Sequence, residues 1–214
     1  MVEQYKAVLF DLDGTLVDSM SMWKEIDVEY LDQFNIPVPE TLQKDIEGLT
    51  MEQTAQYFQK TFSITDSIDD IMRTWNRMAY HKYTKEVEMK PFAREFLYKL
   101  KEMHIPCGIA TSNSRVLAEA ILKSHQIDEC FGAMVTGDDV THGKPAPDVY
   151  LKAAALLGVD PKDCLVFEDI PVGILAGKAA GMTVYAVEDS YSMKDKDEKL
   201  RLSDGYVMSY EELL

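Results

Sequence analysis

The sequence lacks an apolar run that approaches the roughly 18 residues of a membrane-spanning helix. Its first residues, MVEQYKAVLFD, contain no basic segment that leads into a long apolar region. Its three cysteines are widely spaced and form no CxxC pair, which argues against a disulfide framework and against a zinc site. We therefore expect a soluble, cytoplasmic protein with no membrane partner.

Basic residues are scarce relative to acidic ones. The 214 residues include 37 Asp and Glu against 22 Lys and Arg, so the formal net charge is -15. Such a chain repels a phosphate backbone, which argues against a nucleic-acid partner. With 46% hydrophobic residues it can bury a sizeable core, and its length fits one large domain or a core with a smaller insertion.

Short apolar runs of strand length recur along the chain, and stretches with helical periodicity lie between the later ones. The runs cover residues 7–10, 107–110, 134–136, 165–167 and 183–187. This alternation predicts an α/β fold, a doubly wound parallel sheet with helices on both faces. One helix is expected to begin at Pro91 and another to end at Gly158. The charge run over residues 194–201 favours a solvated loop.

Residues 11–106 separate the first two apolar runs, which is far more than a single crossover needs. Most of this stretch has apolar stripes at helical spacing. Within it, Thr50 followed by Gln53 is typical of a capping box that opens a helix. We predict an inserted helical cap domain with hinges at both connections. The expected boundaries are residues 17–85 for the cap and residues 1–16 and 86–214 for the Rossmann-like core.

Polar side chains follow the expected strands at the point where each strand ends. They are Asp11 and Asp13 after the first, Thr111, Ser112 and Asn113 after the second, Lys144 after the segment beyond the third, and Glu168 and Asp169 after the fourth. The crevice outside the carboxyl ends of the strands is the usual ligand site of a doubly wound sheet. Because strand side chains alternate, we expect Asp11 and Asp13 to converge on one point.

Four carboxylates at one end of a sheet require a cation. Their hard oxygens suit Mg²⁺, and no histidine or cysteine lies in these motifs to indicate zinc. A calcium loop of the EF-hand type is excluded, because Leu16 and Met22 stand where it needs glycine and glutamate. Carboxylates, Mg²⁺ and a lysine suit phosphoryl transfer, in which one aspartate can attack phosphorus while another handles the leaving group's proton.

The stretches FDLDGTLVDS, ATSNS, GKPAPDVY and VFEDIPVGILAGKAAGM resemble, in order and spacing, the four motifs of the haloacid dehalogenase superfamily of phosphotransferases. The helical insertion resembles the small cap of the subgroup that contains beta-phosphoglucomutase and phosphoglycolate phosphatase. The resemblance implies that Asp11 is the nucleophile and a magnesium ligand. It implies that Asp13 is the general acid and then the base, with its backbone carbonyl facing the metal.

The resemblance also implies roles for the other motif residues. Thr111, Ser112 and Lys144 would bind the transferring phosphoryl group, with Asn113 beside them. Separately from the resemblance, we expect Arg115 to help Mg²⁺ and Lys144 offset the negative charge near an anionic substrate. Asp169 would complete the metal site, and Glu168 would support it through water. True haloacid dehalogenase activity is not expected, since those enzymes lack the acid/base aspartate and need no magnesium.

Two positions of the expected cap favour hydrolysis over isomerisation. Beta-phosphoglucomutases have a histidine where this chain has Trp23, and a phosphate-gripping arginine where it has Met51, although either residue could equally belong to the cap core. A mutase must hold a bisphosphate intermediate, whereas hydrolysis needs no second phosphate grip. We expect a monomeric, Mg²⁺-dependent phosphatase whose partner is a small phosphorylated metabolite of the sugar or polyol phosphate class. The alternatives are a phosphosugar mutase, a phosphonate hydrolase with a Schiff-base lysine (Lys24, Lys44, Lys60 or Lys82) and a non-enzymatic phospho-receiver module.

Overall fold

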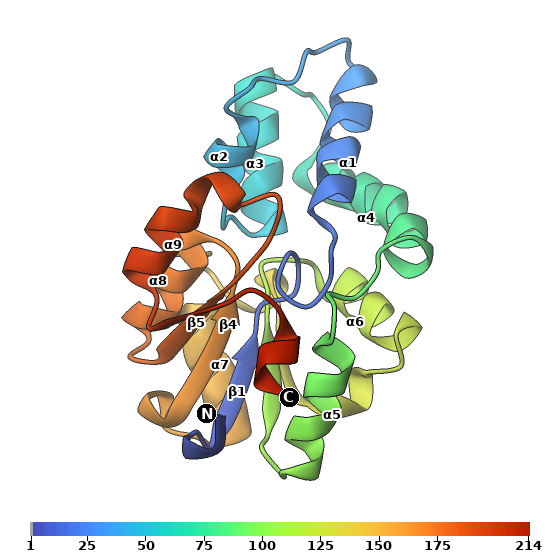
Figure 1. Cartoon of the computed structure of the whole chain (residues 1–214). Helices are drawn as coiled ribbons and strands as arrows, with labels where there is room; N and C mark the ends of the chain where they lie inside the picture. The colour runs from blue at the N-terminus through green and yellow to red at the C-terminus, as the bar shows by residue number, and fades with distance from the viewer. Residues whose placement is uncertain (1) are drawn as a thin grey trace.

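The computed structural model describes residues 2–214 (Figure 1). Within them, six strands form one parallel sheet in the order β3-β2-β1-β4-β5-β6. The strands are β1 Ala7–Phe10, β2 Cys107–Ala110, β3 Phe131–Val135, β4 Cys164–Glu168, β5 Thr183–Val187 and β6 Gly205–Val207. The chain winds outward from β1 first to one side and then to the other. This arrangement confirms the predicted doubly wound α/β fold.

Helices cover both faces of this sheet. They are α5 Ala93–Glu102, α6 Arg115–Ser124, α7 Asp148–Leu157, α8 Pro171–Ala179 and α9 Lys196–Leu202. Val8 and Phe10 of β1 belong to the hydrophobic cluster that includes residues of α5 and α6, whereas Ala7 and Leu9 belong to the cluster with α7 and α8. All four β1 side chains are therefore buried, which explains why the strand is a continuous apolar run.

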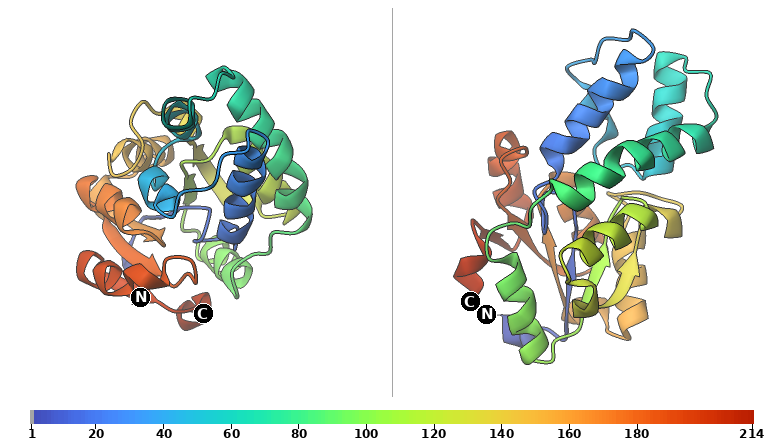
Figure 2. Two further views of the ribbon diagram at one scale, coloured as in Figure 1. Left: turned by 90° about the horizontal axis from the view of Figure 1, so that it is seen from above. Right: turned by 90° about the vertical axis from the view of Figure 1, so that its right-hand side faces the viewer.

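Four helices between β1 and β2 lie over the carboxyl ends of the strands (Figures 1 and 2). They are α1 Met20–Asp32, α2 Leu42–Ile46, α3 Met51–Phe62 and α4 Ile68–Lys85. The predicted capping box is confirmed at α3, where the Thr50 hydroxyl accepts from the Gln53 backbone N–H at 3.2 Å. Val17 forms bridges with both Asp13 and Met89, so the two connections to these helices lie side by side. The division into cap and core at residues 17 and 85 remains a prediction.

Several element predictions were wrong. Helix α5 begins at Ala93, after Pro91, and β3 covers residues 131–135 and not 134–136. The charge run expected to be a loop forms most of α9, because the Lys199 side chain turns inward and is completely buried. Strand β6 was missed because only Val207 of its three residues is buried. No helix within residues 2–214 is long and apolar enough to cross a membrane.

Candidate active site

A cavity lies between the four inserted helices and the carboxyl ends of the strands. Seven of the eight predicted site residues line it, namely Asp11, Asp13, Thr111, Ser112, Asn113, Lys144 and Asp169. The eighth, Glu168, is completely buried at the end of β4 and contacts the side chain of Lys144. The parallel strands thus bring residues from four separate sequence stretches to one place.

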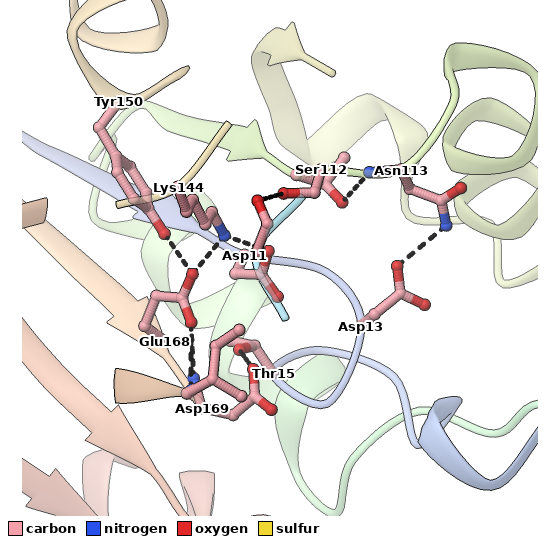
Figure 3. A network of polar contacts seen from close by, with 12 residues as sticks. Asp11, Asp13, Thr15, Ser112, Asn113, Lys144, Tyr150, Glu168 and Asp169 are labelled. Carbon is pink, nitrogen blue, oxygen red and sulfur yellow. Dashed lines mark hydrogen bonds and ion pairs between the residues drawn. The ribbon is translucent and has the colours of Figure 1, made fainter. Parts of the chain in front are cut away.

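Lys144 joins two of the carboxylates. Its ammonium group donates to Asp11 Oδ1 at 2.6 Å and also to Glu168 Oε1 (Figure 3). The hydroxyl of Tyr150, from α7, donates to the same Glu168 oxygen at 2.8 Å. Because the Lys144 side chain is almost fully buried, its charge acts on Asp11 and Glu168 with little screening by water.

Asp11, Glu168 and Asp169 form an acidic cluster. One carboxylate oxygen from each lies within 4.8 Å of the others. Asp169 Oδ1 accepts from the Thr15 hydroxyl at 3.0 Å, whereas its buried Oδ2 has no partner among the described residues. A buried, unpartnered oxygen beside two further carboxylates suits a hard divalent cation such as Mg²⁺. The donor set therefore fits the metal that the sequence predicts.

Burial and mutual repulsion make the ionised forms of Asp11 and Asp169 less favourable. Burial raises the pKa of Asp11 to about 7, although the charge of Lys144 acts in the opposite direction. Burial also raises the pKa of Asp169 well above its usual range, and the charges of Glu168 and Asp11 raise it further. Positive charge held by this cluster would therefore favour the ionised form of Asp11.

The Asp13 carboxylate points away from the acidic cluster (Figure 3). Asp13 Oδ2 accepts from the Asn113 amide at 2.9 Å. Its Oδ1 accepts from the Ser19 hydroxyl at 2.5 Å, the Trp23 indole N–H at 2.9 Å and the Tyr83 hydroxyl at 2.5 Å. Trp23 and Tyr83 belong to α1 and α4, so two of the inserted helices hold this carboxylate in place.

Asp11 and Asp13 line the same cavity but have different partners. Strand β1 ends at Phe10, so the alternation of strand side chains does not extend to Asp13. The chain instead turns at Gly14, whose φ of 83° favours glycine. A Cβ at Gly14 would also collide with Oδ2 of Asp169, so glycine keeps the space beside that oxygen open.

The polar segment after β2 connects the core to the inserted helices. Thr111 and Ser112 line the cavity, and the Ser112 hydroxyl donates to the carbonyl oxygen of Gly48 at 3.2 Å. Arg115 does not line the cavity, which contradicts its expected help with phosphate charge. Its guanidinium is held by Asp139 at 2.5 Å.

Comparisons with known proteins identify the family. Residues 8–187 match the model of the haloacid dehalogenase-like hydrolases. The chain belongs to this family. It is 36% identical to hexitol phosphatase A of Escherichia coli over 184 residues, 85% of this chain and 82% of that protein. It is 32% identical to beta-phosphoglucomutase of Bacillus subtilis over 208 residues, 92% of this chain and 89% of that protein.

A solved structure supports the fold of this haloacid dehalogenase-like hydrolase. The crystal structure of CbbY from Rhodobacter sphaeroides in complex with phosphate matches with a TM-score of 0.86 and 23% identity. The match covers 98% of this chain and 96% of that one. This match supports the fold, whereas the match of residues 8–187 to the family model confirms the family resemblance of the four sequence motifs.

Several polar contacts of this hydrolase site were missed in the sequence. Trp23 and Tyr83 bind Asp13, Tyr150 binds Glu168, and Thr15 binds Asp169. Trp23 lies in one of the apolar stripes of the insertion, and Tyr150 is the last residue of the motif GKPAPDVY. One signal was available, because a buried Trp N–H or Tyr O–H usually finds a hydrogen-bond partner.

Proposed function

We propose that the protein is a magnesium-dependent phosphatase that hydrolyses small phosphomonoesters, with sugar and polyol phosphates as its substrate class. One observation carries this proposal. The Asp11 carboxylate lies 2.6 Å from the Lys144 ammonium group in a cavity that Asp13 also lines. A nucleophile, a cation for the phosphoryl charge and a second carboxyl group for proton transfer are therefore available together. The identity to a hexitol phosphatase supports the substrate class.

In the first proposed step, an Asp11 carboxylate oxygen attacks the phosphorus atom. The bond between phosphorus and the ester oxygen breaks, and Asp13 gives its proton to that oxygen, so the product leaves as an alcohol. The phosphoryl group remains on Asp11 as an aspartyl phosphate. Lys144 balances the charge of the group in transfer, and the hydroxyls of Thr111 and Ser112 orient it.

In the second proposed step, water hydrolyses the aspartyl phosphate. The Asp13 carboxylate, now ionised, takes a proton from the water molecule that attacks phosphorus. The bond between phosphorus and the Asp11 oxygen breaks, which releases inorganic phosphate and restores the Asp11 carboxylate. Asn113, Trp23 and Tyr83 position Asp13 for both proton transfers.

We assign the metal site to Asp11, Asp169 and the Asp13 backbone carbonyl, with Glu168 acting through water. When bound, Mg²⁺ supplies positive charge next to the transferring phosphoryl group. The acidic cluster and the unpartnered oxygen of Asp169 support this assignment.

A phosphosugar mutase is the second candidate, favoured by the identity to beta-phosphoglucomutase. No arginine of the described chain lines the cavity, and Trp23 and Met51 lie in its wall. A bidentate grip on a second phosphate therefore has no obvious donor, which supports hydrolysis. Four cap lysines were considered for Schiff-base chemistry. Of these, only Lys44 lines the cavity, and Lys44 is exposed.

The test incubates the purified protein with sugar, polyol and glycolate phosphates, with and without Mg²⁺. Free phosphate and phosphate isomers are both measured, and Asp11→Asn is the matched control. We expect Mg²⁺-dependent release of phosphate over many turnovers by the wild type and none by Asp11→Asn. Isomer formation faster than phosphate release would contradict the phosphatase, and a single turnover without further release would indicate a receiver.

A further inference from the structure

A buried carboxylate lies on the α1 side of the cavity, apart from the motif residues. Asp27 is only 7% exposed and lines the cavity together with the apolar side chains of Ile26 and Trp75. Its Oδ2 accepts from the Gln43 side-chain amide of α2 at 2.6 Å. No lysine, arginine or histidine of residues 2–214 forms an ion pair with it. An ionised carboxylate in such surroundings lowers the stability of the fold, so its presence indicates a role other than stabilisation.

The second oxygen of Asp27 is available to a ligand. Among the described residues nothing donates a hydrogen bond to Oδ1. This oxygen is also not one of the fully buried polar atoms that lack a hydrogen-bond partner, so it is not completely enclosed by protein atoms. Because Asp27 lines the cavity, Oδ1 can accept a hydrogen bond from a molecule bound there. Gln43 fixes the carboxylate from the other side, so the acceptor is held in place before a ligand arrives.

A tyrosine from the core lies close to this acceptor. Tyr191 follows β5 and lines the same cavity. Burial first, and then the charges of Asp27 and Glu47, together raise the pKa of its hydroxyl to about 12. The phenol therefore stays protonated and can donate a hydrogen bond. An ionised acceptor and a neutral donor suit hydroxyl groups, which both donate and accept.

The charge of this part of the cavity disfavours a second phosphate. Asp27, Glu47 and Asp195 are acidic, against Lys44 and Lys194, which are both exposed. A phosphate placed near Asp27 would meet a buried negative charge without a paired cation, whereas a hydroxyl would gain a charge-assisted hydrogen bond.

We infer that Asp27, positioned by Gln43, determines substrate specificity by accepting a hydrogen bond from a hydroxyl of the leaving group. The preferred substrate is then a hydroxyl-rich monophosphate, such as a hexitol or sugar phosphate, without a second anionic group. This inference rests on the proposed phosphatase function.

The experiment compares kcat/KM for a hexitol monophosphate with kcat/KM for n-propyl phosphate, which has no free hydroxyl. In Asp27→Leu, which has no acceptor, we expect the ratio of the two values to fall about tenfold or more. Asp27→Asn keeps an acceptor oxygen without the charge, so its ratio should lie between those of Asp27→Leu and the wild type. Gln43→Leu removes the positioning amide and should lower the ratio by a smaller factor than Asp27→Leu.

The outcomes distinguish the specificity role of Asp27 from the phosphatase activity itself. Equal loss on both substrates, or an unchanged ratio in folded Asp27→Leu, would overturn the specificity role while leaving the phosphatase intact. Equal kcat/KM of the wild type for n-propyl phosphate and for the hexitol phosphate would also overturn the specificity role. If the wild type releases phosphate from neither substrate, the phosphatase proposal itself fails. If Asp27→Leu does not fold, the ratio of the two kcat/KM values is measured in Asp27→Asn and Gln43→Leu. A ratio equal to that of the wild type in both variants would contradict the inference.

Discussion

Asp11 and Asp13 are separated by one residue, yet their carboxylates have opposite surroundings. Asp11 lies beside Lys144 and two other acids, in the cluster suited to a cation. Within residues 2–214, all the hydrogen bonds that Asp13 accepts come from neutral donors, one of them Trp23 of α1. Two carboxylic acids in different environments can take different roles, and the roles that we propose are nucleophile for Asp11 and proton carrier for Asp13.

The burial of Asp27 should make the free energy of unfolding depend on pH. Burial raises its pKa from 3.8 to about 6, so the folded state binds a proton more tightly than the unfolded chain. The resulting stabilisation is complete below about pH 4 and is lost as the pH rises through about 6. Asparagine cannot ionise and avoids this loss. At about pH 7.5, Asp27→Asn should therefore raise the free energy of unfolding by about 1–3 kcal/mol.

Urea unfolding of Asp27→Asn and wild type at about pH 7.5 and about pH 4 checks this sign. The difference should nearly vanish at the lower pH. Asp32→Asn, at an exposed position of the same helix, is the control and should change stability little at either pH. If Asp27→Asn were less stable than the wild type at about pH 7.5, the carboxylate would be a stabilising group, contrary to this account.

At the scale of elements, the loop between α2 and α3 joins the inserted helices to the core through backbone contacts. The carbonyl oxygen of Gly48 accepts from Ser112, and a Cβ placed on Gly143 would lie only 2.8 Å from the same oxygen. Close approach at this point holds the cavity wall formed by residues 47–49 against the core.

Gly48→Ala should therefore impair substrate processing. The φ of Gly48 is 77°, and an added Cβ would lie 2.8 Å from Val172 Cγ2 and 3.0 Å from the Lys144 carbonyl oxygen. The loop would have to move away from the core, and we expect kcat/KM to fall about tenfold or more. Steady-state kinetics on the best substrate measure the effect.

The matched control is Gly158→Ala. Gly158 has a φ of 69° at the end of α7, and no atom of the described part of the chain lies within 4 Å of an added Cβ. This variant should lose about 1 kcal/mol of stability from backbone strain but keep wild-type kcat/KM. Equal kcat/KM in the two variants would show that contact of the Gly48 loop with the core is unimportant.

Helix α9 supports the segment that follows β5. The Lys199 ammonium group donates to the Val187 carbonyl at 3.0 Å and to the Ser192 hydroxyl at 2.9 Å. The Ser192 hydroxyl in turn donates to the Asp169 carbonyl at 2.8 Å. Lys199→Met would leave these buried acceptors without a donor. We expect it to lower the free energy of unfolding by about 1–3 kcal/mol.

Thermal unfolding measures this loss, which for a chain of this length corresponds to about 2–4 °C per kcal/mol. Lys196→Met on the same helix is the control, because Lys196 is about one-third exposed and pairs with Glu188 near the surface. Its expected change is below about 1 kcal/mol. Similar losses in both variants would mean that the burial of Lys199 has no special structural role.

At the scale of the whole molecule, the sheet could be predicted because its central strands are buried on both faces and are continuously apolar. The capping box at Thr50 was equally predictable, since it depends on residues three positions apart. The edge strand β6 and the buried Lys199 were not, because neither carries a periodic signal. The pairing of Asp27 with Gln43 was also beyond prediction, since it depends on how α1 and α2 pack together.

The acidic cluster links metal binding to the stability of the whole chain. Asp11, Glu168 and Asp169 repel one another, and a cation that binds only the folded state relieves this repulsion. At a concentration about 100 times its dissociation constant, Mg²⁺ should stabilise the fold by about 2.7 kcal/mol and raise Tm by several degrees.

Calorimetry with and without Mg²⁺ tests this expectation independently of activity. Asp169→Asn should lose most of the Mg²⁺-induced shift in Tm, because it removes a charge from the cluster. NaCl at equal ionic strength controls for general screening of the net charge of -15. The same Mg²⁺ shift in Asp169→Asn would place the binding elsewhere.

The most direct test of the account is whether Asp11 carries the phosphoryl group during turnover. The enzyme is mixed with a hexitol monophosphate and Mg²⁺, quenched with acid within the first turnover, digested and mapped by mass spectrometry. We expect a phosphorylated peptide whose modified residue is Asp11 in the wild type, and none in Asp11→Asn, which should fold but not turn over. Phosphate release with no phosphorylated Asp11 at any time, or normal turnover by Asp11→Asn, would contradict it.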